Sequence, residues 1–369
     1  MRLNLERLQS IGKEWEAIIS SYRIPPYTAP LNLQEEREKT LNAHLEGKSY
    51  DPQFNYKNSP EFPVNRLQKF MSILRPDCFL LEKEYYELAR NALLQIRSIQ
   101  THAPADITGA SSLIYGLPDQ TLLADAWHIL KTRNKMVDPT DEEMVSDEDT
   151  ATYLRKIIEQ IGLQEWQVKI CDTMSASMAV YSLDKQIRIR RGSSFSMKDI
   201  HRLRVHEIGV HIFRYENARL QPLSIFKKFP GYLTTEEGLA VFSEAKAGLL
   251  QDSTLRKYAA RVIAVNMALN EPFSKIFQTI TPYVGPDLAF NIISRVKRGF
   301  PDTSQPGAHT KDIIYLRGFR AVQAHLARRP DDYEVLLAGK FGLQHLSLIR
   351  KLMDEGLIVK PRWLPDKLF

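Results

Sequence analysis

Cysteine is nearly absent from this chain: Cys78 and Cys171 are the only two among 369 residues, and they lie far apart. Two separated cysteines provide neither a disulfide framework nor a cysteine-rich zinc finger. Long uncharged apolar runs are absent too, since no segment reaches the roughly 18 residues that a membrane-spanning helix needs. Residues 1–15 also lack the continuous apolar stretch of a secretory signal. We therefore expect no membrane insertion, no export and a reducing, cytoplasmic location.

Charge is nearly balanced, with a net formal charge of only +6. The basic residues come in small groups such as Arg188, Arg190 and Arg191, without the interleaved aromatic residues of a single-strand nucleic-acid binder. We therefore expect solvated basic faces and no nucleic-acid partner. An acidic substrate tail is the alternative explanation for the positive surplus.

Helical periodicity dominates the first third of the chain. Apolar residues recur at helical spacing, for example over residues 67–99, with an interruption at Pro76. We expect a helical N-terminal region over residues 1–136. Residues 137–150 are rich in Asp and Glu, which repel one another, so they predict an acidic linker. Residues 151–369 then form the second domain.

The periodicity changes to two shortly after the acidic segment. Apolar and polar side chains alternate in three segments, residues 166–170, 178–181 and 186–190. Ser196, with Asp199 three residues later, then predicts the capped start of a helix that runs through His206. From Thr234 onwards the pattern is helical again. The sequence therefore predicts an α+β fold, mostly helical, with a small β-sheet preceding this helix.

Four residues have the types and the approximate spacing of a zinc peptidase site: His206, Glu207, His211 and Glu237. Catalytic zinc needs three N or O ligands, an open position for water, and a nearby carboxylate that takes the water's proton. In the common zincin arrangement the two histidines are four residues apart. Here they are five apart, which a regular helix would separate by about 140°. A π-bulge, made easier by Gly209, would bring both onto one face.

The residues alone leave alternatives open. His206 and His211 could be ordinary core or surface histidines. Glu237 lies three residues after Thr234 and could close a capping box without touching a metal. Glu236 or Glu244 could compete with it as the acidic ligand.

The segment from His206 to Pro222, together with Glu236-Glu237-Gly238-Leu239-Ala240, resembles the microtubule-associated tyrosine carboxypeptidase family. It is similar to bacterial members described as flavohaemoglobin-expression-modulating QEGLA-motif proteins. The resemblance extends from about residue 50 to about residue 320, and includes residues 114–119 and 310–316. Because several separated blocks agree in order, the resemblance is specific.

The resemblance implies a zincin-like metallopeptidase that holds one zinc ion through His206, His211 and Glu237, with Glu207 as the general base. The bacterial label has Gln where this chain has Glu236, which favours Glu237 as the ligand. The family implies a carboxypeptidase that removes a C-terminal aromatic residue, in eukaryotic members the terminal tyrosine of tubulin. The implied partner is a peptide or protein C-terminus, with an acidic tail as one form of it.

A carboxypeptidase also needs a cation for the free carboxylate of its substrate, and arginine suits this role because its planar fork binds carboxylates. Tyr315 could donate to the same carboxylate or to the oxyanion. The alternatives are solvated arginines, a lysine in a helix cap and a tyrosine in the core. The basic candidates for this role are Arg214, Arg295, Arg298 and Lys311.

Two further expectations concern the surroundings of the site. Asn217 and Gln221 are candidates to orient the histidine rings, although they could equally end the helix. Gly238 should allow close approach of the motif helix, since it has no β-carbon.

The alternative functions are a catalytically silent regulatory or binding protein of the same fold, and a zinc aminopeptidase with acidic residues that hold a free amine.

Overall fold

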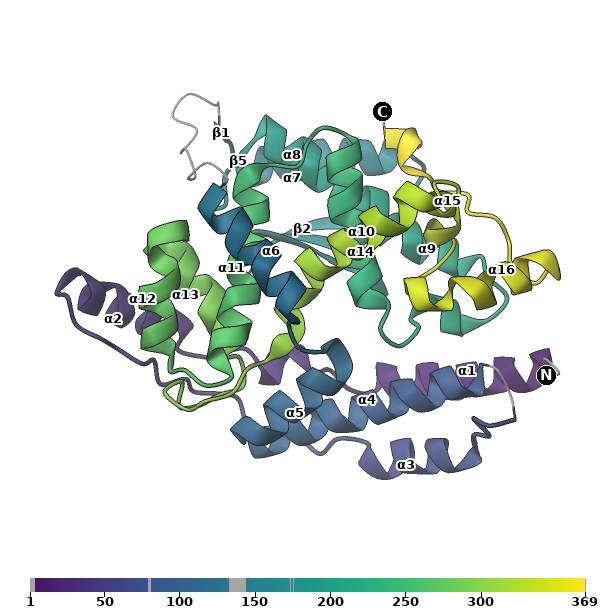
Figure 1. Ribbon diagram of the computed structural model, residues 1–369. Coiled ribbons are helices and arrows are strands. Elements are labelled where there is room, and N and C mark those ends of the chain that lie inside the picture. Colours follow the sequence, from purple (N-terminus) through teal and green to yellow (C-terminus); the bar gives the residue numbers. More distant parts are fainter. Residues whose placement is uncertain (1–3, 79–80, 133–143, 173, 175, 369) are drawn as a thin grey trace.

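The computed structural model describes residues 4–78, 81–132, 144–172, 174 and 176–368. Helices make up most of this part of the chain, and two small sheets lie near its middle (Figure 1). The expected mostly helical α+β fold is thus confirmed at this level. None of the described helices is both long enough and apolar enough to cross a membrane.

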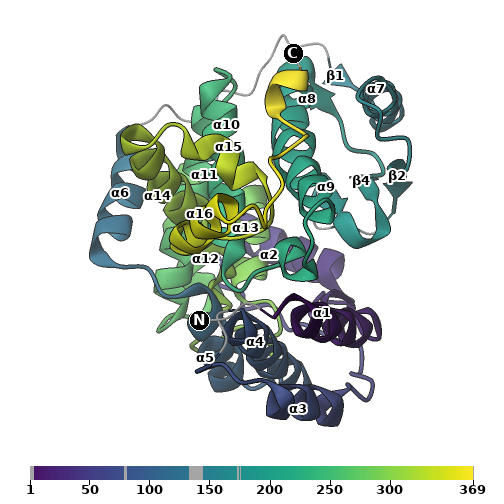
Figure 2. The same ribbon diagram turned by 90° about the vertical axis from the view of Figure 1, so that its right-hand side faces the viewer.

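Helices α1, α3, α4 and α5 gather at the base of the molecule (Figures 1 and 2). The predicted interruption at Pro76 is confirmed, because it falls between α3 and α4. The apolar stripe of α4 is buried from Tyr85 to Ile99. The bounds are α1 Leu5–Ser20, α2 Leu33–Leu45, α3 Val64–Ile73, α4 Glu82–Thr101, α5 Pro104–Tyr115 and α6 Gln120–Thr132.

The acidic segment expected as a linker over residues 137–150 is only partly described. Residues 137–143 lie outside the described residues. Strand β1 (Met144–Val145) pairs antiparallel with β5 (Phe195–Ser196). Helix α7 (Asp147–Gln160) then begins behind the N-cap Ser146, whose hydroxyl accepts the Asp149 N–H.

The three predicted strands form one sheet in the order β2-β4-β3. The central β4 is parallel to β2 and antiparallel to β3. Because its apolar residues alternate, Ile187 and Ile189 are buried together, in one core with Leu154 of α7 and Ile208. The bounds are β2 Gln167–Cys171, β3 Met178–Tyr181 and β4 Gln186–Arg190.

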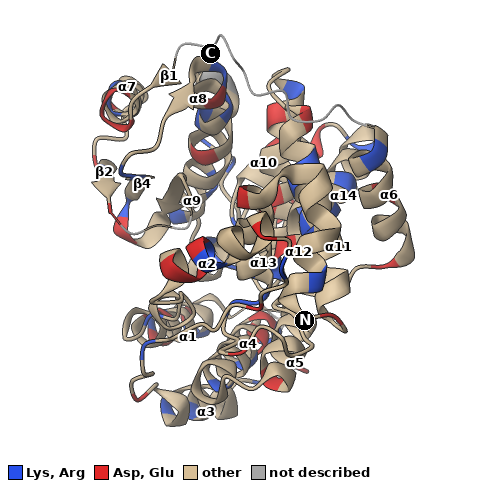
Figure 3. Cartoon of the chain, turned by 90° about the vertical axis from the view of Figure 1, so that its left-hand side faces the viewer, with Lys and Arg blue, Asp and Glu red and all other residues tan. Residues whose placement is uncertain are grey.

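The remaining helices pack beside this unit and contribute to the other two cores. Helix α12 continues through Pro282 and ends at Val284, where Gly285 has a φ of 81°. Figure 3 shows Lys and Arg interspersed with Asp and Glu over the described helices, rather than gathered on one of them. The bounds are α10 Tyr232–Lys246, α11 Asp252–Ala268, α12 Phe273–Val284, α13 Pro286–Val296, α14 Ile314–Arg328, α15 Asp332–Leu337 and α16 Leu346–Asp354.

Candidate metal centre

The motif helix is distorted in the way its histidine spacing predicts. Helix α8 (Met197–Leu203) begins at Ser196, whose hydroxyl accepts the Asp199 N–H at 3.2 Å, as expected. It continues into a π-helix, η3 (Arg204–Ile212), and then into α9 (Phe213–Arg219). The wider turn places His206 and His211 on one face, with ring centroids 4.9 Å apart. Figure 2 shows this continuous rod between the sheet and α10.

Helix α10 packs against the π-helix and supplies the carboxylates. Glu237 faces both histidines: its Oε2 lies 3.5 Å from Nε2 of His206 and 3.7 Å from Nε2 of His211. One donor atom from each of the three residues lies within 4.8 Å of the others. Tetrahedral zinc with bonds of about 2.0–2.2 Å would hold its ligand atoms roughly 3.3–3.6 Å apart. The donor types and their spacing therefore fit a zinc ion.

The other nitrogen of each ring meets a different glutamate. Nδ1 of His206 lies 2.7 Å from Oε1 of Glu244, and Nδ1 of His211 lies 2.9 Å from Oε1 of Glu236. With the carboxylates as acceptors, Nδ1–H donates and Nε2 is left free to bind a metal. Glu236 and Glu244, which competed with Glu237 in the sequence, thus occupy the outer positions around the site.

These outer carboxylates are themselves neutralised. Oε2 of Glu236 accepts from Arg214 at 3.0 Å, and its Oε1 accepts from Lys340 at 2.8 Å. Burial alone would raise the pKa of Glu236, but Lys340, His211 and Arg214 hold it well below its usual range. Oε1 of Glu244 accepts from Arg202 at 3.2 Å. These ion pairs keep Glu236 ionised and place a cation beside Glu244, so that both carboxylates can accept from the rings.

Glu207 and Glu237 are the other two carboxylates of the site, and they differ from Glu236 and Glu244 in their partners. Within the described parts of the chain, neither carboxylate forms an ion pair with Lys or Arg. Glu207 is only 8% exposed, and burial raises its pKa, opposed by His206 and His211. A carboxylate whose pKa is raised is a stronger base, which suits a group that accepts and later returns a proton. Two buried carboxylates without a Lys or Arg partner, beside two histidine rings, also favour a divalent cation.

Gly238 follows Glu237 and sits at the closest approach between α10 and α14, which lie side by side (Figure 1). A β-carbon on Gly238 would lie 2.2 Å from the carbonyl carbon of Gly318. The expected close approach therefore exists, but the neighbour is α14 and not the motif helix. The two glycines fix the position of α10, and hence of Glu237, relative to α14.

Replacing Gly238 with Ala should destabilise the protein by about 3 kcal/mol, because the new methyl group meets backbone that cannot rotate away. Chemical denaturation measures this change. Gly109→Ala is the matched control, since Gly109 is helical and a β-carbon there would meet nothing within 4 Å. Equal stability of both variants would show that the glycine contact does not fix the helix pair.

The proposed orienting role of Asn217 and Gln221 is wrong. The Asn217 side chain donates to the carbonyls of Leu337 and Trp363, and Gln221 donates to the carbonyls of Ala338 and Val359. Both side chains therefore fasten the C-terminal part of the chain to α9. Neither has a hydrogen bond to His206 or His211 among the described residues.

Arg214 is also unsuited to the role predicted for it. It is fully buried, and it donates to Glu236 and to three backbone carbonyls. Each of its three guanidinium nitrogens already donates within the buried interior, so Arg214 supports Glu236 instead. The three carbonyls belong to Leu336, Gly339 and Phe341.

The other predicted substrate-binding residues gather beside Glu237, around a carboxylate that the sequence interpretation missed. Asp312 accepts from Arg295 at 2.6 and 2.8 Å. Arg298 lies farther away, with Nη2 3.8 Å from Asp312, and this buried Nη2 has no hydrogen-bond partner in the described structure. Lys311 is half-buried: desolvation and then Arg298 lower its pKa to about 8, although Glu237 opposes them.

Tyr315 completes this group. Its ring stacks on Tyr258 at 4.9 Å, and the Arg261 guanidinium lies 4.6 Å from its centroid. Burial, reinforced by Glu237, raises the pKa of Tyr315 to about 12. Tyr315 therefore keeps its proton at neutral pH and remains a hydrogen-bond donor. The sequence offered no sign of the Tyr258 and Arg261 contacts.

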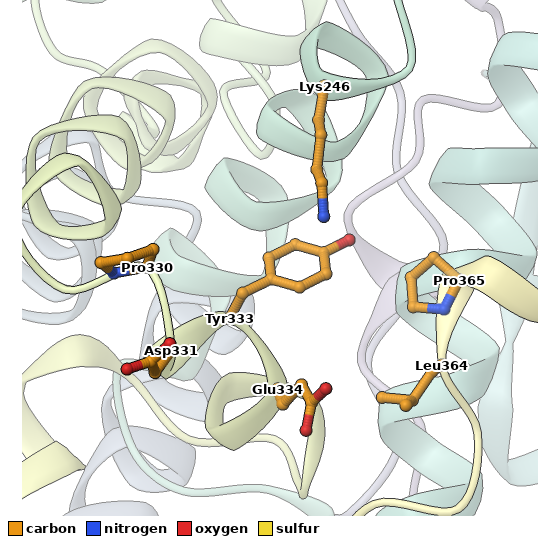
Figure 4. Close-up of a pocket in the computed structure, with 7 residues that line it drawn as sticks. All are labelled: Lys246, Pro330, Asp331, Tyr333, Glu334, Leu364 and Pro365. Carbon is orange, nitrogen blue, oxygen red and sulfur yellow. The ribbon is translucent and has the colours of Figure 1, made fainter.

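A separate surface pocket of about 320 Å³ lies between α10, α15 and the C-terminal segment (Figure 4). Lys246 points towards the ring of Tyr333 there, with Nζ 4.4 Å from the centroid. None of the residues grouped around His206 and His211 lines it. The pocket is formed by Lys246, Pro330, Asp331, Tyr333, Glu334, Leu364 and Pro365.

Comparisons with known proteins identify the family to which the chain belongs. A family model described as microtubule-associated tyrosine carboxypeptidase matches residues 43–368. MATCAP2 of Mus musculus is 30% identical over 168 residues, which cover 44% of this chain and 32% of that protein. Microtubule-associated tyrosine carboxypeptidase 1 of Rattus norvegicus is 30% identical over 164 residues, covering 42% of this chain and 34% of that protein. The chain thus spans about a third of the length of these relatives.

Proposed function

Because the chain belongs to the microtubule-associated tyrosine carboxypeptidase family, we propose that it is a zinc metallocarboxypeptidase. It would hydrolyse the last peptide bond of a peptide or protein and release a C-terminal tyrosine or another aromatic residue. The observation that carries this proposal is the meeting of His206 Nε2, His211 Nε2 and Glu237 Oε2 beside Glu207. The proposal includes a zincin-like catalytic fold, a single zinc ion and a cytoplasmic location.

His206, His211 and Glu237 would hold the ion, and Glu236 and Glu244 would fix the two rings through Nδ1. When bound, zinc would polarise the scissile carbonyl and lower the pKa of water at the site to about 7. Glu207 accepts a proton from the attacking water at its carboxylate. It then returns this proton to the leaving amine, as its raised pKa allows.

The charge beside Glu237 supports a free carboxylate as the bound end of the substrate. Four cations lie around Asp312 there, and Arg295 already forms two hydrogen bonds with it. Arg298 and Lys311 therefore remain as the binding groups, with Tyr315 as a neutral donor. An aminopeptidase would need unpaired carboxylates at this position. The four cations are Arg261, Arg295, Arg298 and Lys311.

An acidic tail upstream of the cleaved bond is the more specific form of this proposal. Lys257 of α11 lies near the site, where burial and then Arg202 and Arg261 lower its pKa to about 7. In the described part of the chain no carboxylate forms an ion pair with it. An acidic side chain of the substrate would stabilise its charged form.

Arg298→Ala should raise the KM for a peptide with a free terminal carboxylate by about 10- to 100-fold, because one charge-assisted hydrogen bond is lost. The value of kcat should change much less. Steady-state kinetics on a tyrosine-ending peptide measure both constants. Arg320→Ala is the control, since Arg320 on α14 pairs with Asp125 instead. An unchanged KM in Arg298→Ala would remove Arg298 from the substrate site.

A panel of peptides that differ only in their last residue tests the whole proposal. Mass spectrometry should detect release of tyrosine or phenylalanine, and no release from the same peptides with an amidated end. Zinc binding without release from any peptide would instead favour the alternative, a catalytically silent regulatory or binding protein of the same fold.

A further inference from the structure

Lys297 is a fully buried lysine directly before Arg298, at the C-terminal end of α13. Its ammonium group is surrounded by main-chain oxygen atoms rather than by carboxylates. In the described parts of the chain, no Asp or Glu forms an ion pair with it. Nζ donates to four carbonyls, those of Ala268 at 3.4 Å, Glu271 at 3.2 Å, Gln305 at 2.6 Å and Gly307 at 3.1 Å.

This oxygen cage suits a cation of single charge. Ala268 is the last residue of α11, and the C-terminal end of a helix carries partial negative charge. The ring of Phe300 lies 5.4 Å from Nζ and adds the negative face of its π system. Rings of carbonyl oxygens replace the hydration shell of potassium ions in the same way. The Lys297 ammonium thus occupies the position that a monovalent cation would take in such a ring of carbonyl oxygens.

The cage joins two turns of the chain. Ala268 and Glu271 belong to the turn between α11 and α12, whereas Gln305 and Gly307 belong to the loop between α13 and α14. The Gly307 N–H also donates to the Ala268 carbonyl at 2.7 Å. The loop therefore closes around the Lys297 ammonium.

The same loop carries the cations of the proposed substrate site. It begins at Arg298 and leads to Lys311, and the His309 N–H donates to the Val296 carbonyl at 2.7 Å where its two ends meet. A loop held at residues 305 and 307 fixes the spacing between Arg298 and Lys311. Loss of the ammonium would free four carbonyls and let the two cations move apart.

We propose that Lys297 is a positioning residue that acts as a built-in monovalent cation, ordering the loop that presents Arg298 and Lys311 to the substrate carboxylate. Its effect on the substrate rests on the proposed carboxypeptidase function, whereas the cage itself does not. A shortened side chain at position 297 should leave a site that takes potassium or ammonium from solution.

The test compares Lys297→Ala with Lys297→Met in the chlorides of potassium, lithium and tetramethylammonium at equal ionic strength. In tetramethylammonium chloride both variants should unfold about 5 °C or more below the wild type. Potassium should recover most of this loss in Lys297→Ala only, because the methionine side chain still fills the space. The KM of Lys297→Ala for a tyrosine-ending peptide should rise about 10-fold and return with potassium, with kcat little changed. The wild type should respond equally to all three salts.

An unfolding midpoint of Lys297→Ala that is the same in all three salts would overturn the proposal. If this variant does not fold during expression, its refolding yield is measured in each salt instead. Refolding only in potassium would support the proposal that potassium replaces the Lys297 ammonium, and failure to refold in every salt would contradict it. A wild type without peptidase activity would contradict the proposed function alone. The comparison of unfolding midpoints would still show whether Lys297 acts as the cation of the carbonyl cage.

Discussion

Glu207→Gln should lower kcat for release of the terminal residue by about 10²- to 10⁴-fold while the protein keeps its fold and its metal. The amide has nearly the shape of the carboxylate, but it cannot accept a proton from water. Glu207 is buried beside both histidines, yet it is not needed to hold their rings, since Glu236 and Glu244 do so. Single-turnover kinetics and elemental analysis on the same sample measure both quantities.

Glu216→Gln is the matched control for this change. Glu216 is a buried glutamate on the continuation of the same rod, but its carboxylate accepts from Trp166 and Arg219, away from the metal site. Its variant should keep full activity. Turnover of Glu207→Gln at the rate of Glu216→Gln would contradict the general-base role.

Glu237→Ala should lose metal affinity far more than either Glu236→Ala or Glu244→Ala. Among the described glutamates only Glu237 directs an oxygen at Nε2 of both rings, so its loss removes one of three proposed ligands. Glu236 and Glu244 meet the Nδ1 atoms, and loss of such an outer contact typically costs about 10- to 100-fold in metal affinity. Competition with a chromogenic chelator measures the three dissociation constants.

The Ala series has internal controls, because the three glutamates lie on one helix and are all buried. Circular dichroism should show equal helix content in the three variants. Equal metal affinity of all three would reject Glu237 as the ligand. A loss largest in Glu244→Ala would transfer the ligand role to Glu244.

Patterns of neighbouring residues predicted much of the secondary structure. The alternating segments 166–170, 178–181 and 186–190 predicted the three strands, and Ser196 with Asp199 predicted the start of the motif helix. The five-residue spacing of His206 and His211 predicted the π-helix, since no regular helix could bring them together. The family resemblance inferred between about residues 50 and 320 is confirmed by a match over residues 43–368.

The contacts that the sequence could not reveal join residues far apart in the chain. Asp312 neutralises Arg295 from 17 residues away, and Lys340 reaches Glu236 across 104 residues. Nothing near Arg214 or Asn217 in the sequence indicates that their partners are carbonyls beyond residue 335. One signal was available: Glu244 follows Glu237 by seven residues, which places both on one face of a helix two turns apart.

Metal content and peptidase activity measured on one sample test the central claim most directly. Elemental analysis of the purified wild type and of His206→Ala/His211→Ala would be combined with an assay of a tyrosine-ending peptide. The account predicts one zinc ion per wild-type chain and release of tyrosine, with both lost in the variant. Wild-type protein that binds no zinc after reconstitution, or a variant that still releases tyrosine, would contradict it.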